Sequence, residues 1–406
     1  MPLTKLFFES TNKTKLSALL ELPVDGHPIA YALFAHCFTC TKNLKAIHHI
    51  SSALAREKIA VLRFDFTGLG ESEGDFADTN FSSNVQDLVA AANFLQSEFT
   101  SPRILIGHSL GGAAVLQAAA RIPSCRAVAT IGAPADPVHV TRLLKDRVEV
   151  IEEKGEAEVS LAGRHFNIKK QFIDDLEQTK MEDVIRNLKK ALLIFHSPID
   201  NTVGIDNAAK IFQVARHPKS FISLDQADHL LMNEADSIYV GAMIAAWARK
   251  YIETPRDKPE KRETANNRVV ARTGKTGYRT EIMANGLSLI ADEPTSLGGT
   301  NMGPSPYEYL VAALGACTSM TLRMYADRKK LPVEEISVTL SHNKIHAKDC
   351  KACDTQNRLV DNIEREVELI GPLDDAQRQR MLEIADKCPV HRTLQSNVVI
   401  NTKLKS

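Results

Sequence analysis

The chain has 406 residues, more than one hydrophobic core usually organises, so we expect two domains. Its 44% apolar and 25% charged residues exclude a disordered or fibrous chain, and its balanced 50 basic and 50 acidic residues exclude a general nucleic-acid or anionic-membrane binder. No apolar run approaches the roughly 18 residues that span a bilayer, and an acidic residue comes too early for a signal peptide. The sequence therefore predicts a cytoplasmic protein that acts on small molecules, without a nucleic-acid or membrane partner.

The first half of the chain alternates short β-rich runs with helical patterns from residue 28 to 252. The predicted strands are 29–35, 60–64, 103–107, 127–132, 191–196 and 220–224, and the predicted helices include 44–57, 82–97, 111–120 and 207–215. This alternation is typical of a doubly wound, mostly parallel sheet with helices on both faces. We therefore predict an α/β domain over residues 1–253.

A polar, charged insertion interrupts this alternation at about residues 135–190. In a doubly wound sheet such an insertion can lie over the carboxyl ends of the strands, where ligands bind. We interpret the insertion as a small lid. The alternative is a surface excursion that has no role.

The second half begins after a charged segment with two prolines at residues 254–264, which we interpret as a linker because it cannot pack. Three predicted strands then precede a long helix, and two more strands precede a second helix and a last strand. These elements are 268–273, 277–283, 287–291, 305–329, 335–342, 362–370, 374–387 and 397–402. Such blocks are typical of a smaller α+β domain, over residues 265–406.

A Gly-His-Ser-Leu-Gly motif centred on Ser109 lies between an apolar strand and an alanine-rich helix. A serine on this sharp turn projects its hydroxyl clear of the sheet, and the flanking glycines relieve the crowding. Because a serine hydroxyl is a weak nucleophile, it needs a histidine base that a carboxylate orients. Asp200 and His229 each follow a predicted strand and give the chain order Ser, Asp, His that this fold uses.

Other residues compete for these two roles. Asp206 and Asp228 are acids near the same loops, and His196 and His217 are further histidines. His196 ends an apolar strand, which favours a structural role, and Asp228 points away from its neighbour if the loop is extended. We therefore keep the first assignment and leave these four residues as alternatives.

Acyl transfer also requires hydrogen-bond donors for the oxyanion. The expected donors are the backbone N–H groups of Leu110, directly after the serine, and of Phe38, in the loop after the strand 29–35. With the segment Arg-Phe-Asp-Phe-Thr-Gly-Leu-Gly-Glu-Ser at 63–72, these motifs resemble the α/β-hydrolase family over nearly all of the first 252 residues. The resemblance implies a serine carboxylesterase, and we expect the insertion to admit short acyl esters. Cys37 departs from it, since these enzymes often carry glycine after the histidine.

Seven cysteines are unevenly spaced, and in a reducing compartment such residues are more often buried, catalytic or metal-bound than paired in disulfides. The segments Gly-Pro-Ser-Pro-Tyr-Glu before Cys317, Cys388-Pro-Val-His, and Asp-Glu-Pro-Thr-Ser-Leu-Gly-Gly at 292–299 resemble the OsmC/Ohr family of thiol-dependent peroxidases. By that resemblance, Cys317 attacks an organic hydroperoxide as a thiolate and Cys388 resolves the sulfenic acid, with an external thiol as reductant. Family members also pair into intertwined dimers, so the resemblance implies a homodimer or higher homo-oligomer.

Members of that family activate the thiolate with an arginine from an early strand and a glutamate ten residues before the cysteine. This chain has Tyr307 at that place and Glu308 one residue later, and its early strands offer Arg272, Lys275 and Arg279. Our first hypothesis is a bifunctional esterase and hydroperoxide reductase. The alternative is an esterase whose second domain serves mainly for dimerisation.

The sequence His-x₃-His-x₃-Cys-x₂-Cys contains four residues with the spacing of zinc ligands, namely His342, His346, Cys350 and Cys353. The two cysteines could instead be a labile redox pair. We favour an exposed polar hairpin that binds no metal, and we expect no cofactor.

Overall fold

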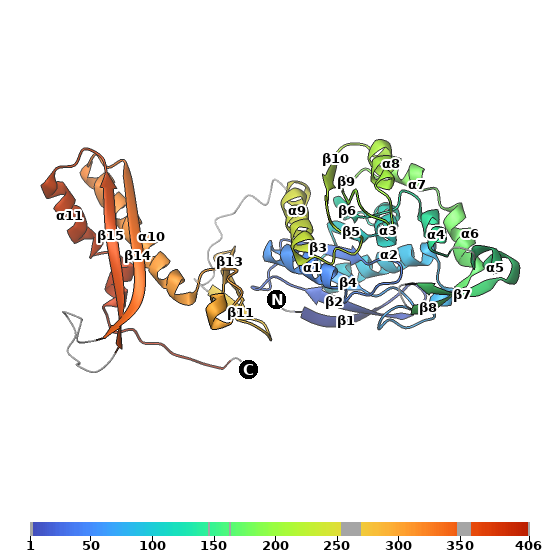
Figure 1. Ribbon diagram of the computed structural model, residues 1–406, viewed down its shortest axis with the longest axis horizontal. Helices are drawn as coiled ribbons and strands as arrows, with labels where there is room; N and C mark the ends of the chain where they lie inside the picture. The colour runs from blue at the N-terminus through green and yellow to red at the C-terminus, as the bar shows by residue number, and fades with distance from the viewer. Residues whose placement is uncertain (1–2, 145–146, 162–163, 253–268, 347–358, 405–406) are drawn as a thin grey trace. The chain divides into compact units, whose positions relative to one another are not determined.

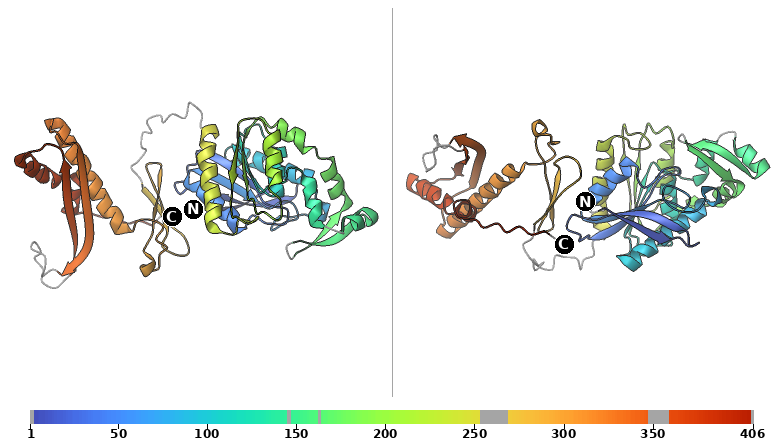
Figure 2. Two further views of the ribbon diagram at one scale, coloured as in Figure 1. Left: turned by 45° about the horizontal axis from the view of Figure 1, so that its top comes forward. Right: turned by 90° about the horizontal axis from the view of Figure 1, so that it is seen from below.

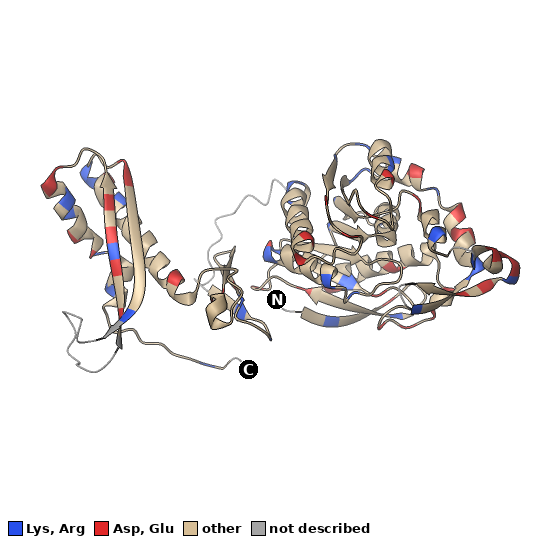
Figure 3. Ribbon diagram, in the orientation of Figure 1, with Lys and Arg blue, Asp and Glu red and all other residues tan. Residues whose placement is uncertain are grey.

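The computed structural model describes residues 3–144, 147–161, 164–252, 269–346 and 359–404 (Figure 1). Contacts divide the chain into two compact units, residues 1–272 with 282–288, and residues 273–281 with 289–406. The predicted linker at 254–264 lies outside the described residues. Basic and acidic residues are interspersed in both units (Figure 3).

The first unit is built on one large sheet. Among the described residues it contains eight strands in the order β1-β2-β4-β3-β5-β6-β9-β10. Pairing is parallel from β4 through β10, while β2 is antiparallel to both β1 and β4. The predicted doubly wound, mostly parallel sheet is confirmed. The strands are β1 (Leu3–Glu9), β2 (Lys15–Glu21), β3 (Ala30–Ala35), β4 (Ile59–Phe64), β5 (Ile104–His108), β6 (Ala127–Ile131), β9 (Ala191–His196) and β10 (Lys219–Ser223).

Helices cover both faces of this sheet. Leu33 of β3 joins the apolar core formed with α2 (Phe81–Glu98), α3 (Leu110–Ala118) and α8 (Asp206–Val214). Phe34, the next residue, joins the opposite core with α1 (Lys45–Arg56) and α9 (Glu234–Ile252). Successive strand residues point to opposite faces, so both sides of β3 are buried, and its run of six apolar residues follows from that. Figure 2 shows the sheet between these two helical layers.

The register of the central strands places their carboxyl ends at one edge. Ala35 of β3 pairs with Gly107 of β5, and Gly107 pairs with Thr130 of β6. The loops that follow these strands therefore start side by side, which is where ligands bind in such sheets.

The insertion between β6 and β9 has its own secondary structure. It contains a short 3₁₀ helix at Pro137–Val140, an antiparallel hairpin and four helices in the described part of the segment. These elements are α4 (Thr141–Leu144), α5 (Arg147–Lys154), β7 (Glu156–Leu161), β8 (Arg164–Lys169), α6 (Lys170–Gln178) and α7 (Met181–Arg186). Apolar residues such as Phe166 and Phe172 join the core of the first unit, so the insertion is packed against it.

The described residues from 269 onward contain strands and helices in blocks, and the prediction of a smaller α+β domain is confirmed, although the contact division assigns parts of the first three strands to the first unit. β11 (Val269–Thr273), β12 (Thr280–Ala284) and β13 (Leu287–Ala291) form one sheet, and β14 (Glu335–His346) pairs with β15 (Leu359–Ile370) in another. The helices are α10 (Pro306–Lys329), α11 (Asp375–Ala385) and α12 (Pro389–Leu394). The predicted strand at 397–402 is wrong, because that segment has no strand partner and exposes Val399 and Ile400.

Within the described ranges, no helix is long and apolar enough to cross a membrane. The cytoplasmic location stays a prediction.

Candidate active site

Ser109 lies on the turn between β5 and α3 with φ 55° and ψ −126°, a backbone conformation that L-residues rarely adopt. Two glycines make the turn possible. A Cβ atom on Gly107 would lie 2.2 Å from the carbonyl oxygen of Gly111, and one on Gly111 would lie 2.4 Å from that of His36. The turn lifts the serine above the end of the strand, as its motif predicts.

The structure brings Ser109, His229 and Asp200 into one chain of hydrogen bonds. Nε2 of His229 is 3.0 Å from Oγ of Ser109, and its Nδ1 is 2.7 Å from Oδ2 of Asp200. The other oxygen of Asp200 accepts hydrogen bonds from the backbone N–H groups of Thr202 and Val203. Burial by itself raises the pKa of Asp200, but His229 and these two N–H groups outweigh it and hold that pKa below its usual value.

Of the competing residues, Asp206, Asp228 and His217 have other places, and His196 lies behind Asp200, with its Nε2 3.8 Å from Oδ2. Asp228 caps its own loop, with one oxygen 2.8 Å from the backbone N of Leu230 and the other 2.9 Å from that of Met232. Asp206 is the first residue of α8, and His217 precedes a cis-proline at the start of β10. The structure therefore places neither acid as the partner of His229.

Two further histidines hold the loops of this site, and the sequence analysis assigned His108 no role. Nε2–H of His108 donates to the backbone oxygen of His229 at 2.6 Å, and Nε2–H of His196 donates to that of Val203 at 2.6 Å. Burial, and then repulsion from the His229 ring, lowers the pKa of His108 to about 3. Burial also lowers the pKa of His196. Both rings are neutral at pH 7 and act as positioning groups.

The depressed pKa of His108 predicts a loss of stability in mild acid. The unfolded histidine binds a proton below about pH 6.5, whereas the folded one stays neutral, so the free energy of unfolding falls as pH drops from 7 toward 3. Between pH 7 and pH 5 we expect a loss of about 2 kcal/mol from this residue. Urea unfolding of a His108→Gln variant, which keeps a donor for His229, should show a smaller loss over that interval. Equal losses in both proteins would contradict the assignment.

The two expected oxyanion donors line one small pocket. Its volume is about 10 Å³, and its walls are His36, Phe38, Phe66, Asn84, Leu110, Gly111 and Ala114. Leu110 begins α3, so its N–H has no carbonyl one turn earlier within the helix. The ring of Phe38 packs against Phe76 and Phe172, with centroid distances of 5.4 and 5.1 Å.

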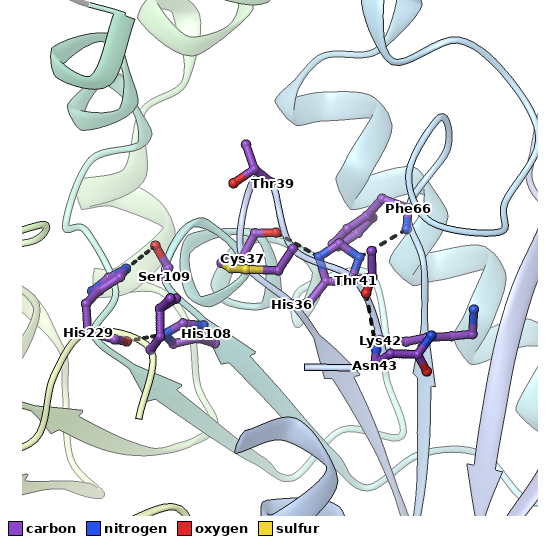
Figure 4. The surroundings of a disulfide bond; sticks show 12 residues. His36, Cys37, Thr39, Thr41, Lys42, Asn43, Phe66, His108, Ser109 and His229 are labelled. Atoms are coloured by element: carbon purple, nitrogen blue, oxygen red, sulfur yellow. Dashed lines mark hydrogen bonds between the residues drawn. A yellow bond between two sulfur atoms is a disulfide. The ribbon is translucent and has the colours of Figure 1, made fainter. Parts of the chain in front are cut away.

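The loop that carries Phe38 is closed by a disulfide between Cys37 and Cys40, whose Cα atoms are 5.3 Å apart. Figure 4 shows this disulfide with Ser109 and His229 among its surroundings. The expectation of unpaired cysteines is wrong for these two. The reason is a tight turn, in which the backbone N–H of Cys40 donates to the oxygen of Cys37 at 3.2 Å and so brings the side chains together.

Buried charges fix the far end of the same loop, a feature that the sequence analysis did not single out. Lys42 and Asp65 are both buried, and Oδ1 of Asp65 accepts the backbone N–H of Lys42 at 2.7 Å. Nζ of Lys42 lies 2.5 Å from Asp65 and 2.6 Å from Glu71. The hydrogen bond from Lys42, followed by that from Lys5, lowers the pKa of Glu71 to about 2. The lysine is therefore neutralised by two carboxylates.

In the second unit, Cys317 lies within α10 and is partly exposed, whereas Cys388 is buried at the N-terminal end of α12. Sγ of Cys388 lies 3.6 Å from Oγ1 of Thr318, the residue next to Cys317. Arg365, which the sequence analysis missed, donates to the same Oγ1 at 3.1 Å. The fold therefore brings Cys388, an arginine and the Cys317 segment together from distant parts of the chain.

Two protein families match this chain. Residues 28–154 match the family described as serine aminopeptidase, S33, and residues 299–403 match the family described as OsmC-like protein. The chain joins an α/β-hydrolase domain to an OsmC-like domain. The protein is a hydrolase, in agreement with the solved esterase domain that its first unit resembles at 53% identity.

One relative of the hydrolase domain is the esterase domain of a Rhodothermus marinus protein, which has a crystal structure. The two sequences are 53% identical, and the match covers 62% of this chain and 100% of that chain with a TM-score of 0.53. The mouse mitochondrial palmitoyl-protein thioesterase ABHD10 is 29% identical over 187 residues, which are 44% of this chain and 61% of that protein. The solved structure of mouse α/β hydrolase domain-containing protein 10, 23% identical over 61% of this chain and 99% of that one, has the same fold with a TM-score of 0.51.

The OsmC-like domain uses its candidate activating residues in other ways. Glu308 accepts the backbone N–H of Ser305 at 2.6 Å and so caps α10, about 13 Å along the helix from Cys317. Hydrogen bonds with the backbone and then with the side chain of Ser305 lower the pKa of Glu308. Arg272 lies in β11 and Arg279 precedes β12, and within the described part of the chain neither joins Cys317 by a hydrogen bond or ion pair.

The residues considered as zinc ligands are only partly described. Nε2 of His342 lies 2.9 Å from Asp361, and its ring stacks on Tyr307 with centroids 4.3 Å apart. His346 ends β14, but its side chain, like Cys350 and Cys353, lies outside the described residues. Among the residues described, no group of three or more histidines, cysteines or acids is arranged to hold a metal.

Proposed function

We propose that the hydrolase domain is a serine carboxylesterase that hydrolyses short-chain acyl esters, with Ser109 as nucleophile. The observation that carries this proposal is the hydrogen-bonded chain from Ser109 through His229 to Asp200 on a strained strand-to-helix turn. Its 53% identity to the Rhodothermus marinus esterase domain supports the same chemistry.

In the first half-reaction, Oγ of Ser109 bonds to the ester carbonyl carbon while Nε2 of His229 takes the hydroxyl proton. The carbonyl electrons move to oxygen, where the backbone N–H groups of Leu110 and Phe38 stabilise the charge. Collapse of this intermediate breaks the ester C–O bond, and His229 returns the proton to the departing alcohol. Asp200 stays ionised, since its pKa is low, and stabilises the imidazolium.

In the second half-reaction, a water molecule bonds to the acyl carbon while His229 takes its proton. The bond to Ser109 then breaks, His229 returns the proton to Oγ, and the carboxylic acid leaves. The pocket beside Leu110 and Phe38 has room for a group of about the size of one water molecule, so it fits an oxyanion rather than an acyl chain.

The insertion is suited to act as a lid over this reaction. Nη1 of Arg164 in β8 donates to the backbone oxygen of Thr39 at 3.1 Å, and Phe172 in α6 packs on Phe38. Both contacts reach the loop that carries the second oxyanion donor. In this position the insertion covers the loop and holds it by these two contacts.

Labelling with a fluorophosphonate tests the nucleophile directly. Because a serine activated by His229 attacks phosphorus, we expect one phosphonate adduct, and peptide mapping by mass spectrometry should place it on Ser109. Denatured protein is the control, since it has no activated serine. An adduct on any other residue would overturn the proposed function.

A second proposed activity is thiol-dependent reduction of organic hydroperoxides by the OsmC-like domain. Cys317 would attack the outer peroxide oxygen as a thiolate, which breaks the O–O bond, releases an alcohol and forms a sulfenic acid. Cys388 would then displace water from that sulfur, and an external thiol would reduce the disulfide. The contact of Cys388 with Thr318, next to Cys317, favours this role.

An assembly role for the OsmC-like domain is the alternative, and exposed apolar side chains favour it. Tyr307, Leu310, Met320 and Met324 on α10 are 37–72% exposed in the single chain. Large exposed apolar groups mark contact surfaces. We therefore propose a homodimer or higher homo-oligomer through this domain, while the cytoplasmic location stays a prediction.

A further inference from the structure

The disulfide in the hydrolase domain joins two cysteines with a two-residue spacing, Cys37-Phe38-Thr39-Cys40, directly after β3. No step of ester hydrolysis uses either sulfur. The pair encloses Phe38, whose backbone N–H is the second proposed oxyanion donor. Closing or opening this small ring therefore acts on the peptide unit that the proposed reaction requires to be fixed.

The two sulfur-bearing residues differ in access. Cys37 is 6% exposed, whereas Cys40 is half-buried at the surface end of the turn. Thiol–disulfide exchange needs an incoming thiolate in line with an accessible sulfur. Of the two residues Cys40 is the more exposed, so we expect an incoming thiol to attack its sulfur, with Cys37 as the leaving thiolate.

Hydrogen bonds hold both ends of the loop, at residues 36 and 42, and the disulfide holds its middle. Nδ1–H of His36 donates to the backbone oxygen of Cys37 at 2.7 Å, and Lys42 is tied to Asp65. Between these two anchors, the disulfide and a side-chain contact from Arg164 to Thr39 hold the turn. Reduction leaves the anchors, the packing of the Phe38 ring and the contact from Arg164 in place, and it removes the one covalent restraint on the backbone of residues 37–40. Figure 4 shows the disulfide beside His36 at one end of the loop and Lys42 at the other.

We propose that Cys37 and Cys40 form a reversible dithiol–disulfide couple that sets the esterase activity of the hydrolase domain, with organic hydroperoxides as oxidant and small dithiols as reductant. The regulatory part of this inference rests on the proposed esterase function. The oxidised pair fixes the N–H of Phe38 toward the substrate oxygen, and the reduced pair lets it turn away for part of the time.

The redox step balances with these two reagents. The Cys40 thiolate attacks a peroxide oxygen, the O–O bond breaks, and the alcohol leaves as Cys40 becomes a sulfenic acid. The Cys37 thiolate then attacks the Cys40 sulfur and water leaves, so two thiols lose two electrons and two protons to one peroxide. In reverse, a dithiol such as dithiothreitol attacks Cys40, forms a mixed disulfide and is released as its own cyclic disulfide.

The full chain tests the couple by two independent measurements. Protein held in reduced or oxidised dithiothreitol is alkylated with iodoacetamide and mapped by mass spectrometry, and hydrolysis of p-nitrophenyl acetate is measured in parallel. We expect both cysteines to be alkylated only after reduction, with kcat then lower by about 3–10-fold, less than the roughly 10²–10³ that follows outright loss of a donor. Removal of the dithiol and addition of cumene hydroperoxide should restore kcat.

Variants locate the response. Cys37→Ser and Cys40→Ser should each show the kcat of the reduced protein and no response to dithiothreitol. If the Cys37→Ser variant does not fold, because Cys37 is the more buried of the two, the Cys40→Ser variant alone provides the test. Cys125→Ala is the matched control, because that buried cysteine lies in the same domain, and it should respond like the parent. Cys317→Ser should also respond, which excludes an effect through the OsmC-like domain.

The outcomes separate the two proposals. A pair that resists reduction, or one that cycles without changing kcat, overturns the switch while esterase activity stands. Absence of hydrolysis in both redox states overturns the esterase and with it the coupling, whereas alkylation still decides whether the pair itself is redox-active.

Discussion

Replacing Ser109 by alanine should lower kcat/KM for p-nitrophenyl acetate by at least about 10⁴-fold, because the proposed acyl intermediate forms on its hydroxyl oxygen. The substitution removes one oxygen and leaves the turn and its hydrogen bond from Ser109 N to Ile131 O in place. Urea unfolding should therefore be almost unchanged. Consumption of cumene hydroperoxide in the presence of dithiothreitol should also be unchanged, since Cys317 and Cys388 lie in the OsmC-like domain.

The reciprocal variant completes the test. Cys317→Ser should stop peroxide consumption and leave ester hydrolysis as it was. Loss of both activities in either variant would exclude two separate centres. An intact chain that consumes no peroxide would leave the assembly role for the OsmC-like domain, and its mass in solution before and after removal of that domain would then be the decisive measurement.

Replacing Asp65 by alanine should destabilise the hydrolase domain by about 3 kcal/mol, because it leaves the fully buried Lys42 short of a partner. Removal of one member of a buried ion pair costs about 3–5 kcal/mol, and Glu71, which also contacts Lys42, keeps the loss at the lower end. Urea unfolding measures this effect. Ester hydrolysis should fall as well, since Asp65 anchors the loop after β3.

A surface pair provides the matched control for Asp65. Glu57 contacts Arg249 at 2.9 Å, but both side chains are nearly half exposed, so Glu57→Ala should cost less than about 1 kcal/mol. If the Asp65 and Glu57 variants unfold at the same urea concentration, the buried charge cluster does not have the role assigned to it.

The sequence was sufficient for the central architecture but not for its edges. Strands such as β3 and β9 are buried on both faces, so their uninterrupted apolar runs identify them. β1 and β2 were both missed. Most residues of β1 are exposed, whereas β2 is largely buried and its short run lies before the region where strands and helices alternate. β7, with three of its six residues exposed, was read as polar surface. At 397–402 an apolar run suggested a strand, yet strands depend on a partner that local sequence does not specify.

The candidate site divides in a similar way. Chain order and strand ends were enough to select Ser109, Asp200 and His229, because the fold gathers the carboxyl ends of its strands. The link from His108 to His229 spans 121 residues and ends on a backbone oxygen, which no side-chain pattern reveals. The Cys37–Cys40 disulfide was missed because a reducing compartment was assumed, in which disulfides are rare. The two-residue spacing of these cysteines was nevertheless visible in the sequence.

The hydrogen bond from His108 to the backbone of His229 has a mechanical consequence. His108 is the last residue of β5, and Ser109 follows it directly, so the same strand end carries the nucleophile and grips the loop of its base. A displacement of this strand end therefore carries the nucleophile and the loop of the base in the same direction. The hydrogen bond couples the position of Ser109 to that of His229 through the backbone, independently of the bond between their side chains.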